Sequence, residues 1–233
     1  MYKNLKVLAV IPARGGSKGV LNKNLRKIKG KTLVERAVDV ARKSKYIDHF
    51  ILSSDSDEII ENAMKAGCDV PFKRPDYLAK DTSSTNDVLI HVLENVESYD
   101  LLVCLQVTSP LVNSDDVDSC IAKCSLEGVK ACISSCMPSK NPYWMFKLKN
   151  GFFDPLMGRE FFNKRRQDLP DVYIPNGAVA VAYADWFKEN KSFYSEYTAS
   201  YVMPAERSFD LDTEFDFLLV ETYLKQKSNN KIS

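Results

Sequence analysis

Histidine is scarce in this chain of 233 residues, which contains only His49 and His91. Two imidazoles are too few to build a metal site from histidine alone. The net charge is also small, at +1, so the overall charge gives no indication of binding to nucleic acid or to a membrane surface. No run approaches eighteen consecutive apolar residues, and residues 1–4 lead straight into an apparent strand. We therefore expect no signal peptide, no transmembrane helix and a cytoplasmic location.

None of the six cysteines forms the Cys-x-x-Cys pair that is usual in structural zinc sites. Cys120 and Cys124 lie four residues apart on an expected helix, and Cys132 and Cys136 lie four apart around an expected strand. Each pair could share one face of its element, so a four-thiolate zinc site is one interpretation. The other, which we favour, is buried free thiols in a reducing compartment.

Strand and helix patterns alternate along most of the chain. The expected strands are continuous apolar runs, as in strands covered on both faces, at residues 7–11, 50–52, 101–105, 131–133 and 178–182. The expected helices lie between and after them, at residues 32–44, 55–67, 85–96, 114–126 and 213–225. This alternation predicts an α/β fold with three α/β/α layers, Rossmann-like, with a mainly parallel sheet, in one domain over residues 1–233.

The alternation breaks at about residues 141–175, which are rich in aromatic residues, proline, glycine and charge. A structureless loop of this length would be unusual inside a compact domain. We therefore expect an inserted hairpin or subdomain whose exposed aromatic side chains pack on a second copy of the chain, in a homodimer. The polar residues 227–233 are expected to form a disordered tail.

The first expected strand runs directly into Ile-Pro-Ala-Arg-Gly-Gly-Ser-Lys-Gly at residues 11–19. Its three glycines allow backbone amides to approach an anion without Cβ atoms in the way. Arg14, Lys18 and Lys23 place three positive charges around the same turn, and Asn24 adds a neutral donor. The loop therefore suits a polyphosphate, since tight packing alone gives no reason for clustered cations.

This loop matches neither of two well-known phosphate-binding motifs. The P-loop requires Gly-Lys followed by Ser or Thr, whereas Lys18 is followed by Gly19 and Val20. The dinucleotide-binding pattern Gly-x-Gly-x-x-Gly is excluded because Gly15 and Gly16 are adjacent.

A second motif lies far along the chain, where Asp210 and Asp212 alternate around Leu211. In an extended segment both carboxylates face the same way, and they repel unless a cation lies between them. Carboxylate oxygens suit Mg²⁺ or Mn²⁺, which also bind phosphate oxygens. The alternative is that Asp212 or Thr213 caps the final helix.

Other polar residues follow expected strands, and ligands of open parallel sheets lie beyond the carboxyl ends of the strands. Gln106 emerges directly after the strand at 101–105. It either contacts a ligand or satisfies backbone groups of its own loop. Hydroxyl side chains at residues 82–85 precede a helix, and the alternative for Ser84 is that it caps this helix.

Taken together, these motifs resemble the acylneuraminate cytidylyltransferases, also called CMP-sialic acid synthetases. The resemblance covers nearly the whole chain and rests on residues 11–19 with Lys23-Asn24, and on Arg74-Pro75, 81–84, 105–110, 165–167, 175–177 and 210–213. It implies a nucleotidyltransferase fold and transfer of CMP from CTP to the anomeric hydroxyl of a nine-carbon 2-keto acid sugar, with release of pyrophosphate. The sequence of the first loop, residues 11–19, favours a sugar of the N-acylneuraminate or legionaminate type.

The resemblance also implies a role for each motif. CTP would be bound by Arg14, Gly15, Gly16, Ser17, Lys23, Asn24, Arg74 and Ser84. The acid sugar would contact Gln106, Arg166, Gln167 and Asn176, of which the last three lie in the region that the family uses for sugar binding and dimer contacts. Asp210 and Asp212 would hold Mg²⁺ or Mn²⁺. Arg14, Lys23 and Asp212 would be catalytic, because positioning and charge stabilisation dominate such transfers.

Three alternatives remain open. The same chemistry could act on pseudaminic acid or Kdo. A phosphatase of the haloacid dehalogenase type also uses aspartates with Mg²⁺, but it needs an aspartate nucleophile directly after the first strand, where this chain has Pro12 and Ala13. A non-catalytic nucleotide-binding module would leave Asp210 and Asp212 without a role.

Overall fold

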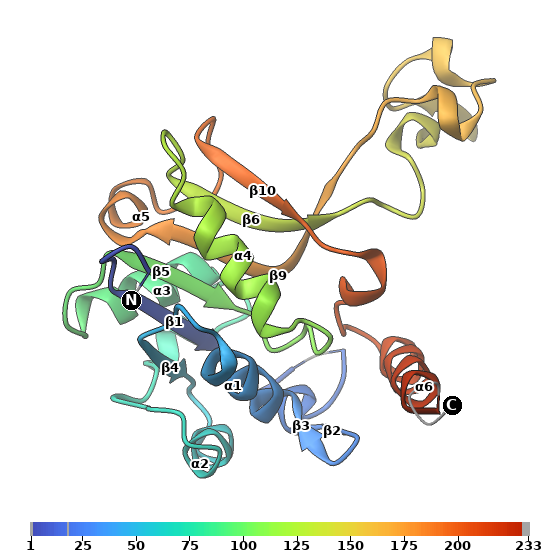
Figure 1. Ribbon diagram of the computed structural model, residues 1–233. Helices are drawn as coiled ribbons and strands as arrows, with labels where there is room; N and C mark the ends of the chain where they lie inside the picture. Colours follow the sequence, from blue (N-terminus) through green and yellow to red (C-terminus); the bar gives the residue numbers. More distant parts are fainter. Residues whose placement is uncertain (1, 18, 230–233) are drawn as a thin grey trace.

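The computed structural model describes residues 2–17 and 19–229, and its core is one six-stranded sheet with the order β10-β6-β9-β5-β1-β4 (Figure 1). The strands are β1 (Val7–Pro12), β4 (His49–Ser53), β5 (Leu101–Leu105), β6 (Ala131–Cys136), β9 (Ile174–Tyr183) and β10 (Thr198–Val202). Strand β1 pairs in parallel with β4 and β5, and β10 pairs in parallel with β6. Only β9 is antiparallel to its neighbours in this sheet. The predicted mainly parallel sheet is confirmed.

Helices cover both faces of the sheet, which gives the predicted three layers. One face packs against α1 (Leu33–Lys43), α2 (Asp57–Lys65), α4 (Ser114–Cys124) and the start of α6 (Glu214–Asn229). The other face packs against α3 (Thr85–Glu94) and α5 (Ala184–Asn190). Within β1, Val7 and Ala9 belong to the first core, whereas Leu8 and Val10 belong to the second. The strand is therefore apolar at every position because both of its faces are buried.

Shorter elements complete the chain. The small strands are β2 (Lys27–Ile28), β3 (Lys31–Thr32), β7 (Phe146–Lys149) and β8 (Phe152–Pro155). The 3-10 helices are η1 (Lys23–Leu25), η2 (Asp76–Leu78), η3 (Pro142–Trp144), η4 (Arg159–Phe161), η5 (Arg166–Asp168) and η6 (Ala205–Arg207).

Residues 137–173 form an arm that projects away from the sheet between β6 and β9 (Figure 1). Its hairpin pairs β7 with β8, and the connecting residues Asn150 and Gly151 both have positive φ, at 53° and 83°. Two residues of this kind are typical of a tight hairpin turn that fits the twist of its strands. The chain leaves from the carboxyl end of β6 and returns at the same edge, so β9 must run antiparallel to β6.

The C-terminal helix is longer than predicted. It ends at Asn229 rather than near residue 225, so residues 227–229 of the expected disordered tail belong to it. Residues 230–233 lie outside the described residues. Within the described part of the chain, no helix is long and apolar enough to cross a membrane. The expected cytoplasmic location stays a prediction.

The cysteines are free thiols, as the favoured interpretation expected. Burial raises the pKa of both Cys104 and Cys124 to about 12, so neither is a reactive thiolate at neutral pH. Among the described residues, no three or more His, Cys, Asp or Glu side chains are grouped to hold a metal ion, which argues against a four-thiolate zinc site.

Candidate active site

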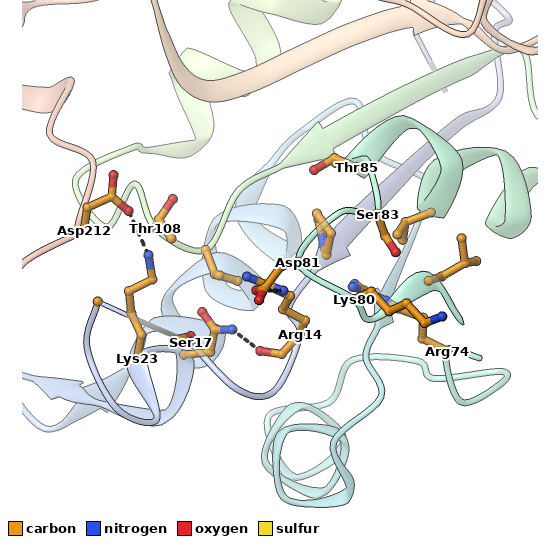
Figure 2. Close-up of a pocket in the computed structure, with 16 residues that line it drawn as sticks. Arg14, Ser17, Lys23, Arg74, Lys80, Asp81, Ser83, Thr85, Thr108 and Asp212 are labelled. Carbon is orange, nitrogen blue, oxygen red and sulfur yellow. Dashed lines mark hydrogen bonds and ion pairs between the residues drawn. The ribbon is translucent and has the colours of Figure 1, made fainter. Parts of the chain in front are cut away.

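A cleft of about 460 Å³ opens where β1 and β5 end (Figure 2). Four segments that are distant in sequence form its walls: the loop after β1, the region around η2 with the start of α3, the loop after β5, and Asp212 before α6. The lining residues are Pro12, Arg14, Ser17, Gly19, Lys23, Asn24, Arg74, Leu78, Lys80, Asp81, Ser83, Thr85, Val88, Val107, Thr108 and Asp212. The cleft thus lies at the predicted edge of the sheet.

Hydrogen bonds within the protein fix the conformation of the loop after β1. Asn24 is buried, and its Nδ2 donates to the carbonyl oxygen of Arg14 at 2.8 Å, which ties the end of the loop to its beginning. The amide of Gly15 donates to Asp55 Oδ1 at 2.9 Å. This amide therefore stabilises the loop, although the sequence suggested that it faces an anion. Asp55 follows β4 at the same edge of the sheet, and that position is the signal by which it could have been found.

Arginine and lysine side chains concentrate positive charge in the cleft. Arg74 is only 4% exposed, and its Nε donates to Ser53 Oγ at 3.1 Å. Burial lowers the pKa of Arg74 to about 10, so this guanidinium remains charged at neutral pH. Arg14 Nη1 lies 2.7 Å from Asp81 Oδ1. Lys80 also lines the cleft, and nothing in the sequence pattern had marked it (Figure 2).

The Asp210-Leu211-Asp212 segment has the predicted alternation. Leu211 is fully buried, and its amide donates to the carbonyl oxygen of Thr108 at 2.9 Å. Both aspartates are exposed on either side of it. Asp212 Oδ1 lies 3.0 Å from Lys23 Nζ (Figure 2). Partial desolvation and the nearby Asp212 charge raise the pKa of Asp210, against the opposing effects of Thr108 and Lys23.

The final helix does not use the Asp212 carboxylate as its cap. The Thr213 amide and hydroxyl donate to Asp216 Oδ2 at 2.7 and 2.8 Å, and the Asp216 amide donates back to Thr213 Oγ1 at 3.3 Å. The Asp212 amide donates to the same Asp216 oxygen at 3.0 Å. Of the two capping alternatives, the structure therefore favours Thr213, and the Asp212 side chain faces the cleft.

Gly19 brings the first loop against the aspartate segment. A Cβ atom at this position would lie 2.4 Å from the carbonyl oxygen of Asp212, which is closer than any real Cβ contact. The backbone of Gly19 is not in the left-handed region, so this contact is what requires glycine here.

Two of the predicted site residues, Ser84 and Asn176, form hydrogen bonds with other groups of the protein. Ser84 Oγ accepts from the Asp87 amide at 3.1 Å and donates to Asp87 Oδ2 at 2.7 Å, so it caps α3, while its neighbours Ser83 and Thr85 line the cleft. Asn176 is 8% exposed, and both ends of its amide are hydrogen-bonded within the protein. Its partners are Ser134 Oγ at 2.6 Å, the Ala178 amide at 3.2 Å, Ser208 Oγ at 2.9 Å and Met203 Sδ at 3.2 Å.

The other expected sugar contacts lie outside the main cleft. Gln106 lines a smaller cavity of about 130 Å³, which shares the lining residue Thr85 with the cleft. The walls of this cavity also include Gly177, Phe193 and Tyr194. Arg166 and Gln167 belong to η5 in the projecting arm. The structure of one chain therefore does not bring them to Gln106.

The donor set fits the divalent cation that the sequence predicts. Mg²⁺ is usually bound in proteins by one or two carboxylates, with waters and substrate phosphates completing its octahedron. Asp210 and Asp212 supply two carboxylates that face solvent beside a cleft rich in positive charge. A metal here would share the Asp212 carboxylate with Lys23, which contacts its Oδ1, or would displace Lys23 from it.

Comparisons with known proteins agree with this geometry. Residues 8–141 match the cytidylyltransferase family. A CMP-N,N'-diacetyllegionaminic acid synthase of Campylobacter jejuni is 31% identical, over 96% of this chain and 97% of that protein. An N-acylneuraminate cytidylyltransferase of Streptococcus agalactiae is 32% identical, over 94% of this chain but 54% of that longer protein. A solved CMP:2-keto-3-deoxy-manno-octonic acid synthetase in complex with CTP has the same fold, with a TM-score of 0.72, 16% identity, and coverage of 95% of this chain and 99% of that one.

The family match and the fold are those of a nucleotidyltransferase enzyme. More narrowly, the chain belongs to the cytidylyltransferase family.

Changing Gly19 to alanine should separate the first loop from the aspartates. Because the added Cβ would overlap the Asp212 carbonyl oxygen, one of the two segments must move. A shift on the order of 1 Å commonly costs about 100-fold in rate, and we expect a loss of that size in kcat for nucleotidyl transfer. Gly128→Ala is the control, since its Cβ meets open space at a positive φ. It should lower the free energy of unfolding by about 1 kcal/mol without slowing the reaction. Equal rates for the two variants would contradict the interpretation.

The raised pKa of Asp210 predicts how the metal-free protein responds to pH. Folding disfavours the ionised carboxylate, so this group lowers stability once the pH rises above its ordinary pKa. We therefore expect Asp210→Asn to raise the Tm in EDTA at pH 7, and the gain to shrink as the pH falls and the carboxyl is protonated in both states. Asp185→Asn, at a 92% exposed side chain, should change little. A lower Tm for Asp210→Asn than for the wild type at pH 7 would show that folding does not disfavour the ionised Asp210 carboxylate.

Proposed function

We propose that this enzyme transfers CMP from CTP to the anomeric hydroxyl of a nine-carbon 2-keto acid sugar of the N-acylneuraminate or legionaminate type, with release of pyrophosphate. The observation that carries the proposal is that one cleft joins clustered cations with Asp212, and that Asp210 lies two residues away on the same segment. A triphosphate requires the cations, and a divalent ion that bridges it to the protein requires the carboxylates. The names of the C. jejuni and S. agalactiae relatives support the acid-sugar class.

Arg14, Lys23 and Arg74 would bind the triphosphate and compensate the negative charge that develops on pyrophosphate as it leaves. Arg74 is suited to this because it is already buried and oriented by Ser53, so little reorganisation is needed on binding. Arg14 is paired with Asp81 and Lys23 with Asp212. Both cations would therefore exchange an internal carboxylate for a phosphate.

Asp210 and Asp212 would hold Mg²⁺ or Mn²⁺, which would polarise the α-phosphate towards attack. The cavity beside Gln106 would hold the acid sugar, because it shares the lining residue Thr85 with the cleft and offers the Gln106 amide together with apolar walls.

A homodimer would bring the arm to a second active site. The apolar face of the hairpin includes Phe146, Leu148 and Phe153, and the last two are 73% and 75% exposed. Apolar groups exposed on this scale mark interaction surfaces. Arg166 and Gln167 sit on the same arm, away from the cleft of their own chain, so they could contact sugar only in a partner's site.

The direct test of the proposed function is pyrophosphate release. The enzyme is incubated with Mg²⁺, with CTP or another nucleoside triphosphate, and with a panel of N-acylneuraminic, legionaminic and pseudaminic acids and Kdo. We expect release with CTP and an N-acylneuraminate or legionaminate acceptor, and about background release with ATP. Asp212→Ala should abolish release while the fold is retained, whereas Asp185→Ala should be as active as the wild type. Release without any acid, or an active Asp212→Ala variant, would refute the proposal.

The dimer is tested on the arm itself. We expect light scattering to find a dimer for the wild type and a monomer for Leu148→Ser/Phe153→Ser, because the substitutions make its exposed apolar face polar. The monomer should also release less pyrophosphate, since Arg166 and Gln167 no longer reach a partner. Leu126→Ser, at a 52% exposed residue of the main body, is the control and should stay dimeric. A monomeric wild type would contradict this part of the proposal.

A further inference from the structure

Asp116 on α4 is a fully buried carboxylate outside the cleft. Its Oδ1 accepts from Arg207 Nη2 at 2.6 Å and from the Tyr201 hydroxyl at 3.2 Å. Its Oδ2 accepts from Arg207 Nε at 3.1 Å and from the Asn113 amide at 3.0 Å. Desolvating a carboxylate is costly, and a two-point contact with arginine is the arrangement that best offsets the cost.

Helix capping alone does not account for this burial. Asp116 and Asn113 form a capping box at the start of α4, but Asp216 and Glu35 serve comparable helix starts from positions that are not fully buried. What distinguishes Asp116 is its ion pair with Arg207, which is 91 residues away in the sequence.

Arg207 ends η6, three residues before Asp210. The residues from Ser208 to Thr213 belong to no helix or strand, so nothing regular in the backbone fixes the two aspartates. The segment is instead tied at separate points. Ser208 Oγ accepts from Asn176 Nδ2 at 2.9 Å, and the Leu211 amide donates to the Thr108 carbonyl oxygen at 2.9 Å. The Asp116–Arg207 pair adds a tie whose carboxylate is fully buried, unlike the exposed Asp212 carboxylate that pairs with Lys23.

The same carboxylate also holds the facing wall. Asp116 accepts a hydrogen bond from the Asn113 amide. Asn113 is the last residue of the loop that follows β5, and the same loop contains Thr108. The carbonyl oxygen of Thr108 in turn accepts from the Leu211 amide at 2.9 Å. One buried group therefore fixes both the aspartate segment and the loop against which that segment packs.

We propose that Asp116, acting through Arg207, is a positioning residue for the Asp210/Asp212 pair. Neither residue is among the described residues that line the cleft, so neither is expected to touch substrate. The planar guanidinium fork sets both the distance and the orientation of the segment, which a lysine cannot do. The inference rests on the proposed metal role of the two aspartates. It predicts that loss of the fork weakens metal-dependent steps while leaving nucleotide binding by the cationic loop unchanged.

The test measures metal coupling by binding as well as by rate. The affinity for CTP is measured by calorimetry once in EDTA and once in Mn²⁺. The affinity in Mn²⁺ divided by the affinity in EDTA is the Mn²⁺ enhancement. For Arg207→Met we expect unchanged affinity in EDTA, an enhancement about tenfold smaller, and a kcat about 10- to 100-fold lower, the range seen when groups that support metal ligands are removed. Arg207→Lys should lie between this variant and the wild type, and Tyr201→Phe should have the smallest effect. Arg42→Lys, in an ion pair with Asp39 away from the segment, is the matched control.

The outcomes separate this inference from the proposed function. If the Arg207 variants are less stable but keep the wild-type enhancement and kcat at a temperature where they are folded, the pair is merely structural and the inference is wrong. If Arg207→Met does not fold, the enhancement and kcat of the Arg207→Lys and Tyr201→Phe variants are compared with the wild type instead. Wild-type values in both variants would again show that the inference is wrong. No enhancement in the wild type itself would also overturn the inference. A wild type that releases no pyrophosphate, yet shows an enhancement that Arg207→Met lowers, would refute the proposed function and support the positioning role.

Discussion

The active-site architecture depends on the contact between the loop after β1 and the segment that ends at Asp212. Gly19 lies so close to the Asp212 carbonyl oxygen that a single Cβ atom would separate them, and Lys23 Nζ lies 3.0 Å from the Asp212 carboxylate. Residues 23 and 212 meet across 189 positions of sequence. They can do so because β1 and β5 are neighbours in the sheet and because Leu211 is hydrogen-bonded to the loop after β5. The cations and the Asp212 carboxylate therefore line one common cleft.

Much of the fold could be predicted from the sequence, because strands covered on both faces are apolar at every position. That signal located β1, β4, β5 and β6, and the alternation with helices predicted the layers. The reversed direction of β9 could not be predicted, since an apolar run reads the same in either direction. Its direction follows from where the arm returns to the sheet. The extent of α6 was underestimated because its polar final turns resemble a tail.

The site was predictable where chemistry is concentrated in a short motif, as at Arg14, Lys23 and Asp212, which all line the cleft. It was less so where a polar side chain serves the fold. Asn176 follows the motif expected for a sugar contact, but its partners Ser134 and Ser208 lie 42 and 32 residues away and become visible only in three dimensions. Lys80 and the Asp116–Arg207 pair carried no pattern of their own, because their importance comes from neighbours that are distant in the sequence.

The central claim is that the cationic loop and the aspartate pair are two halves of one site, joined by a divalent ion on the nucleotide. The most direct measurement is a crystal structure of the enzyme with CTP and Mn²⁺, in which anomalous scattering locates the metal. We predict an anomalous peak about 2.0–2.2 Å from oxygens of both Asp210 and Asp212 and bound to the α-phosphate, with the triphosphate on Arg14 and Lys23. A Mn²⁺ ion held by the triphosphate alone, with both aspartates free of it, would contradict the account.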